Sequence, residues 1–272
     1  MESKHTGPGY AGRLARLQDL LRQADGLCVA VSGGVDSVVL LHAAHTALGE
    51  RAVGVVADSP SLPRAELAAA RRAAAAMGAR LEVVATDELA DPRYQRNAGD
   101  RCYFCKEALF DAMALVAERH GLVELSFGEI VDDAADDRPG ARSAAERGVR
   151  APLAEAGFGK DDVRRYAREH GLEVWDKPSS ACLASRIPRG TAVTRERLAR
   201  VEAAEAEVRA LGFRVLRVRD HGEHARLELG ADERERGERL RDELERKLGE
   251  FGFTELALAT YVTPGERPAP RP

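Results

Sequence analysis

The chain has 272 residues, of which 44% are hydrophobic and 32% charged, a composition that excludes a wholly disordered or fibrous protein. Its formal net charge of −4 provides no global positive field that would hold duplex DNA. Four cysteines are too few for a disulfide-stapled secreted scaffold, and no apolar run approaches the ~20 residues of a membrane span. We therefore expect a cytoplasmic protein whose thiols are free to react or to bind metal.

Strands and helices alternate along the first half of the chain. Leucines at helical spacing predict a helix over 12–24, and the apolar run 27–31 predicts a buried strand that ends at two glycines. The pattern continues with predicted helices over 36–45, 64–77 and 106–118 and predicted strands over 52–57, 81–84 and 123–127. Strands that alternate with helices of about ten to fifteen residues indicate βαβ units on a parallel sheet.

The second half changes its pattern near Thr194. Before it come an acidic stretch over 128–159, long enough to be functional, a helix over 160–170 and a loop-like segment over 175–190. After it we expect a helix to 211, strands over 215–219 and 225–229, a helix over 232–248 and a strand over 256–262. These elements predict an α/β domain over 1–190, a small α+β domain over 191–262 and a disordered tail over 263–272.

The glycine-rich stretch Ser32-Gly33-Gly34-Val35-Asp36-Ser37 lies where the first predicted strand gives way to a helix. There an α/β sheet presents backbone N–H groups and a helix N-terminus to a ligand, so the loop is suited to cradle phosphate. It lacks the Gly-Lys-Ser/Thr ending of a Walker loop, which favours holding a leaving pyrophosphate during attack at the α-phosphate. The alternative is that the two glycines form only a tight turn.

This loop resembles the pyrophosphate loop of the N-type ATP pyrophosphatases, which adenylate their substrates. The resemblance implies a parallel-sheet fold of the adenine nucleotide alpha hydrolase-like (PP-loop) type and use of ATP and Mg²⁺. It further implies that Asp36 is a catalytic residue that organises Mg²⁺ and pyrophosphate. The implied nucleotide-binding set is Ser32, Gly33, Gly34, Val35, Asp36, Ser37, Asp58, Ser59 and Gly128.

Three cysteines lie in segments that we expect at the carboxyl edge of the sheet. Cys102 and Cys105 form a Cys-x-x-Cys just before a predicted helix, whose N-terminus and neighbouring cations favour thiolates, and Cys182 lies in the loop-like segment. Cys28, within an apolar strand, is expected to be a small buried hydrophobe. The residues leave open a zinc site, a [4Fe–4S] cluster with one iron lacking a protein ligand, a catalytic thiol with a resolving pair, or unrelated free thiols. The count of three fits the cluster better than zinc, which normally has a second cysteine pair.

Five segments together resemble the LarE family of ATP-dependent sulfur transferases, over roughly residues 15–262: Arg101–Lys106, Asp136–Gly140, Val149–Gly157, Trp175–Pro188 and Arg217–His221. The resemblance implies adenylation of a carboxylate of pyridinium-3,5-biscarboxylic acid mononucleotide and its conversion to a thiocarboxylate, a step toward the nickel-pincer nucleotide of lactate racemase. Cys182 matches the sulfur-donating cysteine. With Cys102 and Cys105 present, the chain resembles the group whose [4Fe–4S] cluster carries an extra sulfide. The resemblance also implies a homo-oligomer such as a hexamer.

One departure from the family pattern is Gly128-Glu129-Ile130, where the family usually has Gly-Thr-Asn.

The substrate of such an enzyme is an anionic small molecule, so cationic side chains must receive it. Arg186, Arg217 and Arg219 are the candidates, because guanidinium pairs bidentately with carboxylate and phosphate, and Glu228 completes the predicted substrate-binding set. Positions 217 and 219 alternate and so share one face of a strand. The alternative for them is a solvated charged strand.

Three rival functions remain. A tRNA thiolase would need an RNA-binding surface, which the negative net charge and the 5% aromatic content do not favour, and we expect neither nucleic acid nor membrane as a partner. An amide-forming ligase would leave the cysteines without a role. A non-catalytic nucleotide-binding protein with a structural zinc would bind nucleotide without releasing pyrophosphate.

Overall fold

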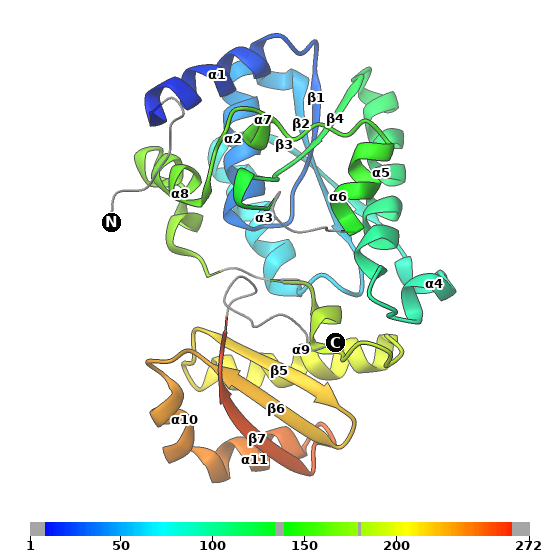
Figure 1. Ribbon diagram of the computed structural model, residues 1–272, viewed down its shortest axis with the longest axis vertical. Coiled ribbons are helices and arrows are strands. Elements are labelled where there is room, and N and C mark those ends of the chain that lie inside the picture. Colours follow the sequence, from blue (N-terminus) through cyan, green and yellow to red (C-terminus); the bar gives the residue numbers. More distant parts are fainter. Residues whose placement is uncertain (1–8, 134–138, 179–180, 263–272) are drawn as a thin grey trace. The chain divides into compact units, whose positions relative to one another are not determined.

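The computed structural model describes residues 9–133, 139–178 and 181–262, which belong to two compact units (Figure 1). The first unit spans Met1–Tyr94 and Asp100–Ser180, and the second spans Gln95–Gly99 and Ala181–Pro272. Residues 181–190, which the predicted domain boundary assigns to the first domain, therefore group with the second unit. The tail predicted to be disordered, 263–272, lies outside the described residues.

Four parallel strands form the sheet of the first unit in the order β3-β2-β1-β4. They are β1 (Leu27–Ala30), β2 (Ala52–Asp58), β3 (Arg80–Ala85) and β4 (Glu124–Phe127). In the register, Leu27 of β1 lies opposite Ala52 of β2 and Glu124 of β4. All of β1 is buried, as expected for a parallel strand covered on both faces. The predicted α/β class with a parallel sheet is confirmed, and all four carboxyl ends lie at one edge.

Helices cover both faces of this sheet (Figure 1). One face packs against α1 (Tyr10–Arg22), α2 (Val35–Leu48), α3 (Arg64–Met77) and α8 (Lys160–Glu169). The other face packs against α5 (Arg101–His120) and α6 (Pro139–Glu146). Alternate residues of β1 belong to the two clusters, with Val29 on the α2 side and Cys28 on the α5 side.

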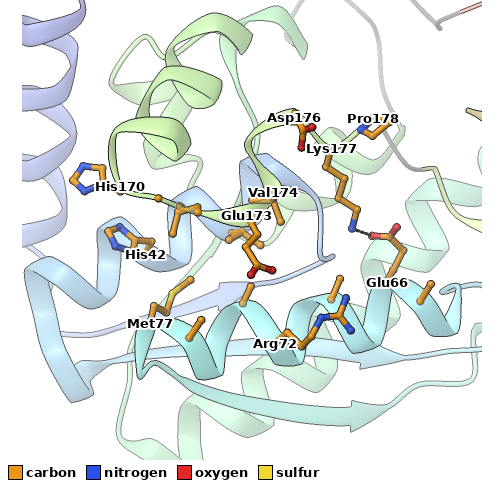
Figure 2. A pocket seen from close by; sticks show the side chains of 17 residues that line it. His42, Glu66, Arg72, Met77, His170, Glu173, Val174, Asp176, Lys177 and Pro178 are labelled. Carbon is orange, nitrogen blue, oxygen red and sulfur yellow. Dashed lines mark hydrogen bonds and ion pairs between the residues drawn. The ribbon is translucent and has the colours of Figure 1, made fainter. Parts of the chain in front are cut away.

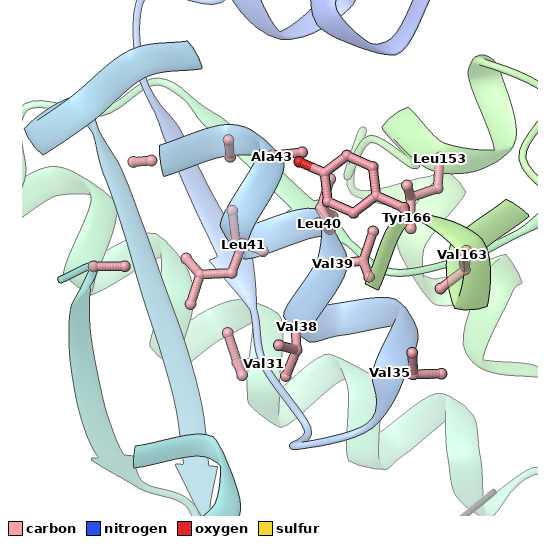
Figure 3. Close-up of a cluster of buried hydrophobic side chains, with 14 of the residues drawn as sticks. Val31, Val35, Val38, Val39, Leu40, Leu41, Ala43, Leu153, Val163 and Tyr166 are labelled. Carbon is pink, nitrogen blue, oxygen red and sulfur yellow. The ribbon is translucent and has the colours of Figure 1, made fainter. Parts of the chain in front are cut away.

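Helix α2 is the central element of the first cluster. Val38, Val39, Leu40 and Leu41 are consecutive and at most 1% exposed, so the helix is apolar all round. Figure 3 shows Tyr166 of α8 among these side chains. Because α2 is enclosed in this way, the loop that opens it has a rigid support.

The second unit contains a three-stranded mixed sheet in the order β5-β6-β7. β5 (Leu216–His221) pairs antiparallel with β6 (His224–Leu229), and β6 pairs parallel with β7 (Glu255–Thr260). Side chains from α9 (Arg195–Ala210) and α11 (Arg241–Gly249) form a core cluster with those of the three strands. The expected small α+β arrangement is confirmed.

Two helix boundaries predicted from the sequence were wrong in detail, and one stretch for which no helix was predicted contains two. The helix expected over 232–248 is two helices, α10 (Arg234–Arg239) and α11, because Leu240 leaves helical geometry at φ −102° and ψ 16°. The acidic stretch 128–159 contains α6 and the short α7 (Pro152–Glu155), which are anchored by buried apolar side chains such as Ala144 and Leu153. The helix expected from 106 begins at Arg101.

The remaining short elements are α4 (Pro92–Gln95) and single 3₁₀ turns at Gly49–Arg51, Glu88–Ala90, Val131–Asp133, Glu173–Asp176 and Leu183–Arg186.

Candidate active site

The loop between β1 and α2 closes on itself through two serine hydroxyls. The backbone N–H of Ser32 donates to Ser37 Oγ at 3.1 Å, and that hydroxyl donates to the carbonyl oxygen of Gly34 at 3.0 Å. Ser32 Oγ lies 3.2 Å from Ser37 Oγ. The first N–H groups of a helix have no acceptor within it, and the helix dipole adds positive potential there. The start of α2 can therefore bind an anion such as phosphate.

Gly33 is required in this loop for two reasons. Its φ of 78° lies in the left-handed region that favours glycine, and a Cβ atom there would lie 2.7 Å from the carbonyl oxygen of Glu66 in α3. Lys177 Nζ donates to the carbonyl oxygen of Gly33 at 2.8 Å and to Glu66 Oε2 at 2.7 Å. The loop is thus fixed against α3. This contact was not predicted from the sequence, in which Lys177 is distinguished only by its place in the Trp175–Pro188 segment.

Asp36 lies in the first turn of α2, and one oxygen of its carboxylate accepts no hydrogen bond from the described residues. Within the described part of the chain, its buried Oδ1 has no hydrogen-bond partner. Burial raises the pKa of Asp36 to about 6, and Asp133 adds to this rise, whereas Lys160 and Arg164 oppose it. A buried carboxylate oxygen without a donor is suited to a hard cation such as Mg²⁺. Neither Lys160 nor Arg164 was named from the sequence, because α8 is distant from Asp36 along the chain.

The other predicted nucleotide contacts lie at the ends of β2 and β4. Asp58 forms an ion pair with Arg64, whose Nη2 also donates to the carbonyl oxygen of Ser59 at 2.7 Å. A Cβ atom on Gly128 would lie 2.8 Å from the backbone nitrogen of Ser37, so Gly128 adjoins the loop. Contacts of these residues with a nucleotide stay a prediction.

The cysteine pair of the first unit lies within the first two turns of α5 rather than ahead of the helix as expected. Asp100 is the N-cap of the helix, and Gly99 before it has a φ of 110°. Cys102 is exposed and Cys105 half-buried. Burial lowers the pKa of Lys106, and the neighbouring Cys105 and Cys102 oppose that shift through their charge.

Lys106 also lies against two aromatic rings, with its Nζ 4.9 Å from the ring centre of Phe127 and 5.4 Å from that of Phe110. Since Phe127 is the last residue of β4, this end of α5 adjoins the carboxyl end of that strand.

Cys28 is fully buried, and burial raises its pKa to about 12, so it is the inert hydrophobe that was predicted.

A cavity of about 580 Å³ lies between α2, α3 and residues 170–178 (Figure 2). Figure 2 shows His42 and His170 at one end and the Lys177–Glu66 pair at the other. Burial, with His170 and His45 nearby, lowers the pKa of His42, whose Nδ1 lies 2.9 Å from the hydroxyl of Tyr166. None of the site residues predicted from the sequence lines this cavity.

Cys182 lies in the second unit, directly before the 3₁₀ turn Leu183–Arg186, and is half-buried. The side chain of Arg186 holds the chain around it, because Nη1 donates to the carbonyl oxygens of Ala181 at 2.6 Å and Cys182 at 3.0 Å. Its Nε donates to Glu205 Oε1 at 2.8 Å. With an exposure of 1%, Arg186 supports the cysteine-bearing turn, and a direct bond to substrate would require this network to open.

The other three predicted substrate-binding residues lie together on one face of the small sheet. Arg217 pairs in register with Glu228, and Arg219 donates to Glu228 Oε2 from Nη2 at 2.7 Å and from Nε at 3.1 Å. Arg219 Nη1 also donates to the carbonyl oxygen of Ser185 at 2.7 Å. Burial lowers the pKa of Arg217, and the positive charge of Arg186 adds to this shift. The two arginines thus form a concentrated positive site partly balanced by one carboxylate.

Among the described residues, no group of three or more His, Cys, Asp or Glu side chains is arranged to hold a metal ion. No helix in that part of the chain is long and apolar enough to cross a membrane.

Comparison with known proteins decides the family. The chain is 37% identical over 248 residues to a pyridinium-3,5-bisthiocarboxylic acid mononucleotide synthase of Lactiplantibacillus plantarum, covering 90% of this chain and 88% of the relative. This chain belongs to the LarE family of such synthases. It is also 42% identical over 217 residues to an uncharacterized protein of Synechocystis sp., covering 80% and 81% of the two chains. No protein-family profile matches it.

The LarE-family motifs are divided between the two units. The Arg101–Lys106 segment lies in the first unit, and Cys182–Pro188 and Arg217–His221 lie in the second. Asp136, Arg138 and Ser179 of these motifs lie outside the described residues. Glu205, which binds Arg186, was not identified from the sequence, because one glutamate in a helix rich in glutamate carries no distinguishing pattern.

Proposed function

We propose that this protein is an ATP-dependent sulfur transferase that converts a carboxylate of pyridinium-3,5-biscarboxylic acid mononucleotide to a thiocarboxylate, a step in nickel-pincer nucleotide biosynthesis. The observation that carries the proposal is the Ser32–Ser37 loop, which opens α2 and presents the unpartnered oxygen of Asp36. Similarity to a pyridinium-3,5-bisthiocarboxylic acid mononucleotide synthase, at 37% identity over 90% of this chain, supports the choice of substrate.

The first step activates the carboxylate. Its oxygen attacks the α-phosphorus of ATP, the bond to the bridging oxygen breaks, and the products are an acyl adenylate and pyrophosphate. Mg²⁺ bound at Asp36 would neutralise phosphate charge. The N–H groups at the start of α2 stabilise the leaving pyrophosphate. Lys160 and Arg164, whose charges reach Asp36, add positive potential at the same place.

The second step transfers sulfur. A sulfide sulfur attacks the acyl carbon, the carbon–oxygen bond to AMP breaks, and the thiocarboxylate and AMP leave. Arg217 and Arg219 would receive the phosphate or carboxylate of the substrate, since guanidinium groups match both. Cys182 is the residue that we assign to sulfur delivery.

The sulfur source that we propose is a [4Fe–4S] cluster ligated by Cys102, Cys105 and Cys182. Held by these residues, the cluster would supply sulfur at the sulfide level, taken from hydrosulfide in solution, so the transfer would need no oxidant. Two observations support this choice of ligands: the three thiols lie outside the hydrophobic core, in contrast to Cys28, and two of them interact with the charge of Lys106. The alternative is that Cys182 donates its own sulfur and becomes dehydroalanine.

Product analysis tests the first step. Turnover with ATP, Mg²⁺, the mononucleotide and hydrosulfide should yield AMP and pyrophosphate, and ADP with orthophosphate would refute the assignment. A nucleotide-binding protein without catalysis would release no pyrophosphate, and a tRNA thiolase would release it only with tRNA.

Anaerobic reconstitution tests the second step. We expect about four irons per chain in the wild-type protein, and cysteine-to-alanine variants at 102, 105 and 182 should lose them. Stoichiometric zinc without iron would contradict the cluster.

Intact mass after turnover separates the two sulfur sources, since sacrifice of Cys182 removes about 34 Da as H₂S. Sedimentation velocity of the same protein tests the proposed homo-oligomer, for which we expect a hexamer.

A further inference from the structure

Lys177 holds one carbonyl group of the phosphate-binding loop. Its Nζ donates to the carbonyl oxygen of Gly33 at 2.8 Å and to Glu66 Oε2 at 2.7 Å. The side chains of Lys177 and Glu66 are 23% and 12% exposed, so water competes poorly for the ammonium group. Figure 2 shows this ion pair at one end of the cavity between α2 and α3. The hydrogen bond from Lys177 therefore helps to fix the conformation of the loop.

The orientation of the peptide between Gly33 and Gly34 decides whether it can bind an anion. In a trans peptide the C=O and N–H groups point in opposite directions, so an oxygen held toward Lys177 turns the N–H of Gly34 away from it. That N–H approaches Ser32 Oγ at 3.4 Å, beside the hydroxyls that close the loop. Two adjacent glycines offer little steric resistance to a peptide flip, which would present an oxygen to phosphate instead.

We propose that Lys177 is a positioning residue that fixes this peptide with its N–H turned into the loop, and that Glu66 keeps the ammonium group in place. The inference rests on the proposed use of ATP. On this view Lys177 and Glu66 together determine the affinity of the loop for pyrophosphate. Lys177 precedes Cys182 by five residues in the chain. Lys177, which would fix the loop, is thus close in sequence to the cysteine to which we assign sulfur delivery.

Direct contact of Lys177 with the phosphates is the rival interpretation, and Glu66 distinguishes the two. If Lys177 bound phosphate itself, Glu66→Gln would release its ammonium group and strengthen pyrophosphate binding. If Lys177 positions the peptide, Glu66→Gln loosens the ammonium group and weakens binding, as Lys177→Met does.

Calorimetric titration of the full-length chain with pyrophosphate, ATP and AMP, each with Mg²⁺, tests the proposal. We expect Lys177→Met and Glu66→Gln to weaken pyrophosphate and ATP binding about 10- to 100-fold, because a hydrogen bond to a charged group is lost. AMP, which lacks the β- and γ-phosphates, should bind as to the wild-type protein. Lys177→Arg can still donate to both acceptors and should recover most of the affinity.

Arg72→Met is the matched control, because Arg72 lines the same cavity and makes no hydrogen bond or ion pair with the described residues. Unchanged pyrophosphate affinity in both Lys177→Met and Glu66→Gln, or tighter binding by Glu66→Gln, would overturn the inference and leave the proposed function standing. A wild-type protein that binds neither ATP nor pyrophosphate would overturn both. If circular dichroism shows that Lys177→Met does not fold, the pyrophosphate affinities of Glu66→Gln and Lys177→Arg decide the question. We expect the first to be weakened and the second to be close to that of the wild-type protein.

Discussion

Glu205→Gln should destabilise the second unit more than any exposed charge change of the same kind. Glu205 is 1% exposed and accepts hydrogen bonds from Arg186 at 2.8 and 3.1 Å, from Arg209 at 3.1 Å and from the backbone N–H of Val218 at 3.1 Å. Burial alone would raise the pKa of Glu205, but the charge and hydrogen bonds of Arg186 outweigh it and hold the pKa below its usual value. The amide would leave Arg186 buried without a counter-charge.

The expected loss follows from that uncompensated charge. Removing one partner of a buried ion pair costs about 3–5 kcal/mol. For a protein of this size that corresponds to a fall in melting temperature of about 6–20 °C. Because the pKa of Glu205 is lower in the folded state, its contribution is fully present above its ordinary value of 4.5 and is lost as the pH falls through the folded-state value.

Thermal melting followed by circular dichroism at pH 7 measures the effect. Glu207→Gln is the control, because Glu207 lies in the same helix and pairs with Lys247 while 39% exposed, so about 1 kcal/mol or less is at stake. Replacing both Arg186 and Glu205 by Met and Leu should recover much of the stability. A Glu205→Gln protein as stable as the Glu207→Gln control would refute the role assigned to the buried pair.

Two further predictions concern the first unit. Asp36→Asn should abolish pyrophosphate release in assays that contain Mg²⁺. In EDTA, where no metal offsets the buried charge, the same variant should be more stable than the wild-type protein by about 1–2 kcal/mol at pH 7. Because the folded-state pKa of Asp36 is raised to about 6, this gain should be full above that pH and vanish below about pH 4, and a loss of stability at pH 7 would contradict it. Lys106→Met should slow alkylation of Cys102 and Cys105 by iodoacetamide about three- to tenfold, because it removes a positive charge that interacts with both thiols, and equal rates would rule this out.

The periodic spacing of apolar residues made the sheets and most helices predictable. Contacts between residues distant in sequence leave no such pattern and could not be predicted. The helix expected over 64–77 matches α3, because apolar positions at helical spacing report one packed face directly. Asn97 shows the opposite case. It is 1% exposed with φ 54°, and its Nδ2 donates to the carbonyl oxygens of Pro188 at 2.8 Å and Thr191 at 3.0 Å. Those acceptors are backbone atoms, which carry no residue-type signal, so the link of 95–99 to the second unit could not be foreseen.

The site residues divide in the same way. The Ser32–Ser37 loop could be located from sequence because a strand, two glycines and a helix agree on one backbone shape. What fixes that shape is Lys177 with Glu66, a pair 111 positions apart. Arg186 was recognised as a cation near Cys182, but its burial against Glu205 depends on how α9 packs, which no local pattern encodes.

Gly128 matches a glycine of the family pattern, and the structure leaves no room for a side chain at this position. A Cβ atom there would lie 2.8 Å from the nitrogen of Ser37 and 2.9 Å from the carbonyl carbon of Asp36, and both are backbone atoms of the buried helix α2, which cannot yield. Gly128→Ala should therefore push the end of β4 away from the loop, with an overpacking cost of about 1–3 kcal/mol and weaker pyrophosphate binding. Gly249→Ala is the control, because it meets nothing within 4 Å in α11 and should be neutral or stabilising by about 0.5–1 kcal/mol. Pyrophosphate binding and melting temperature measure the difference, and a Gly128→Ala protein equal to the Gly249→Ala control in both would show that this close approach does not shape the site.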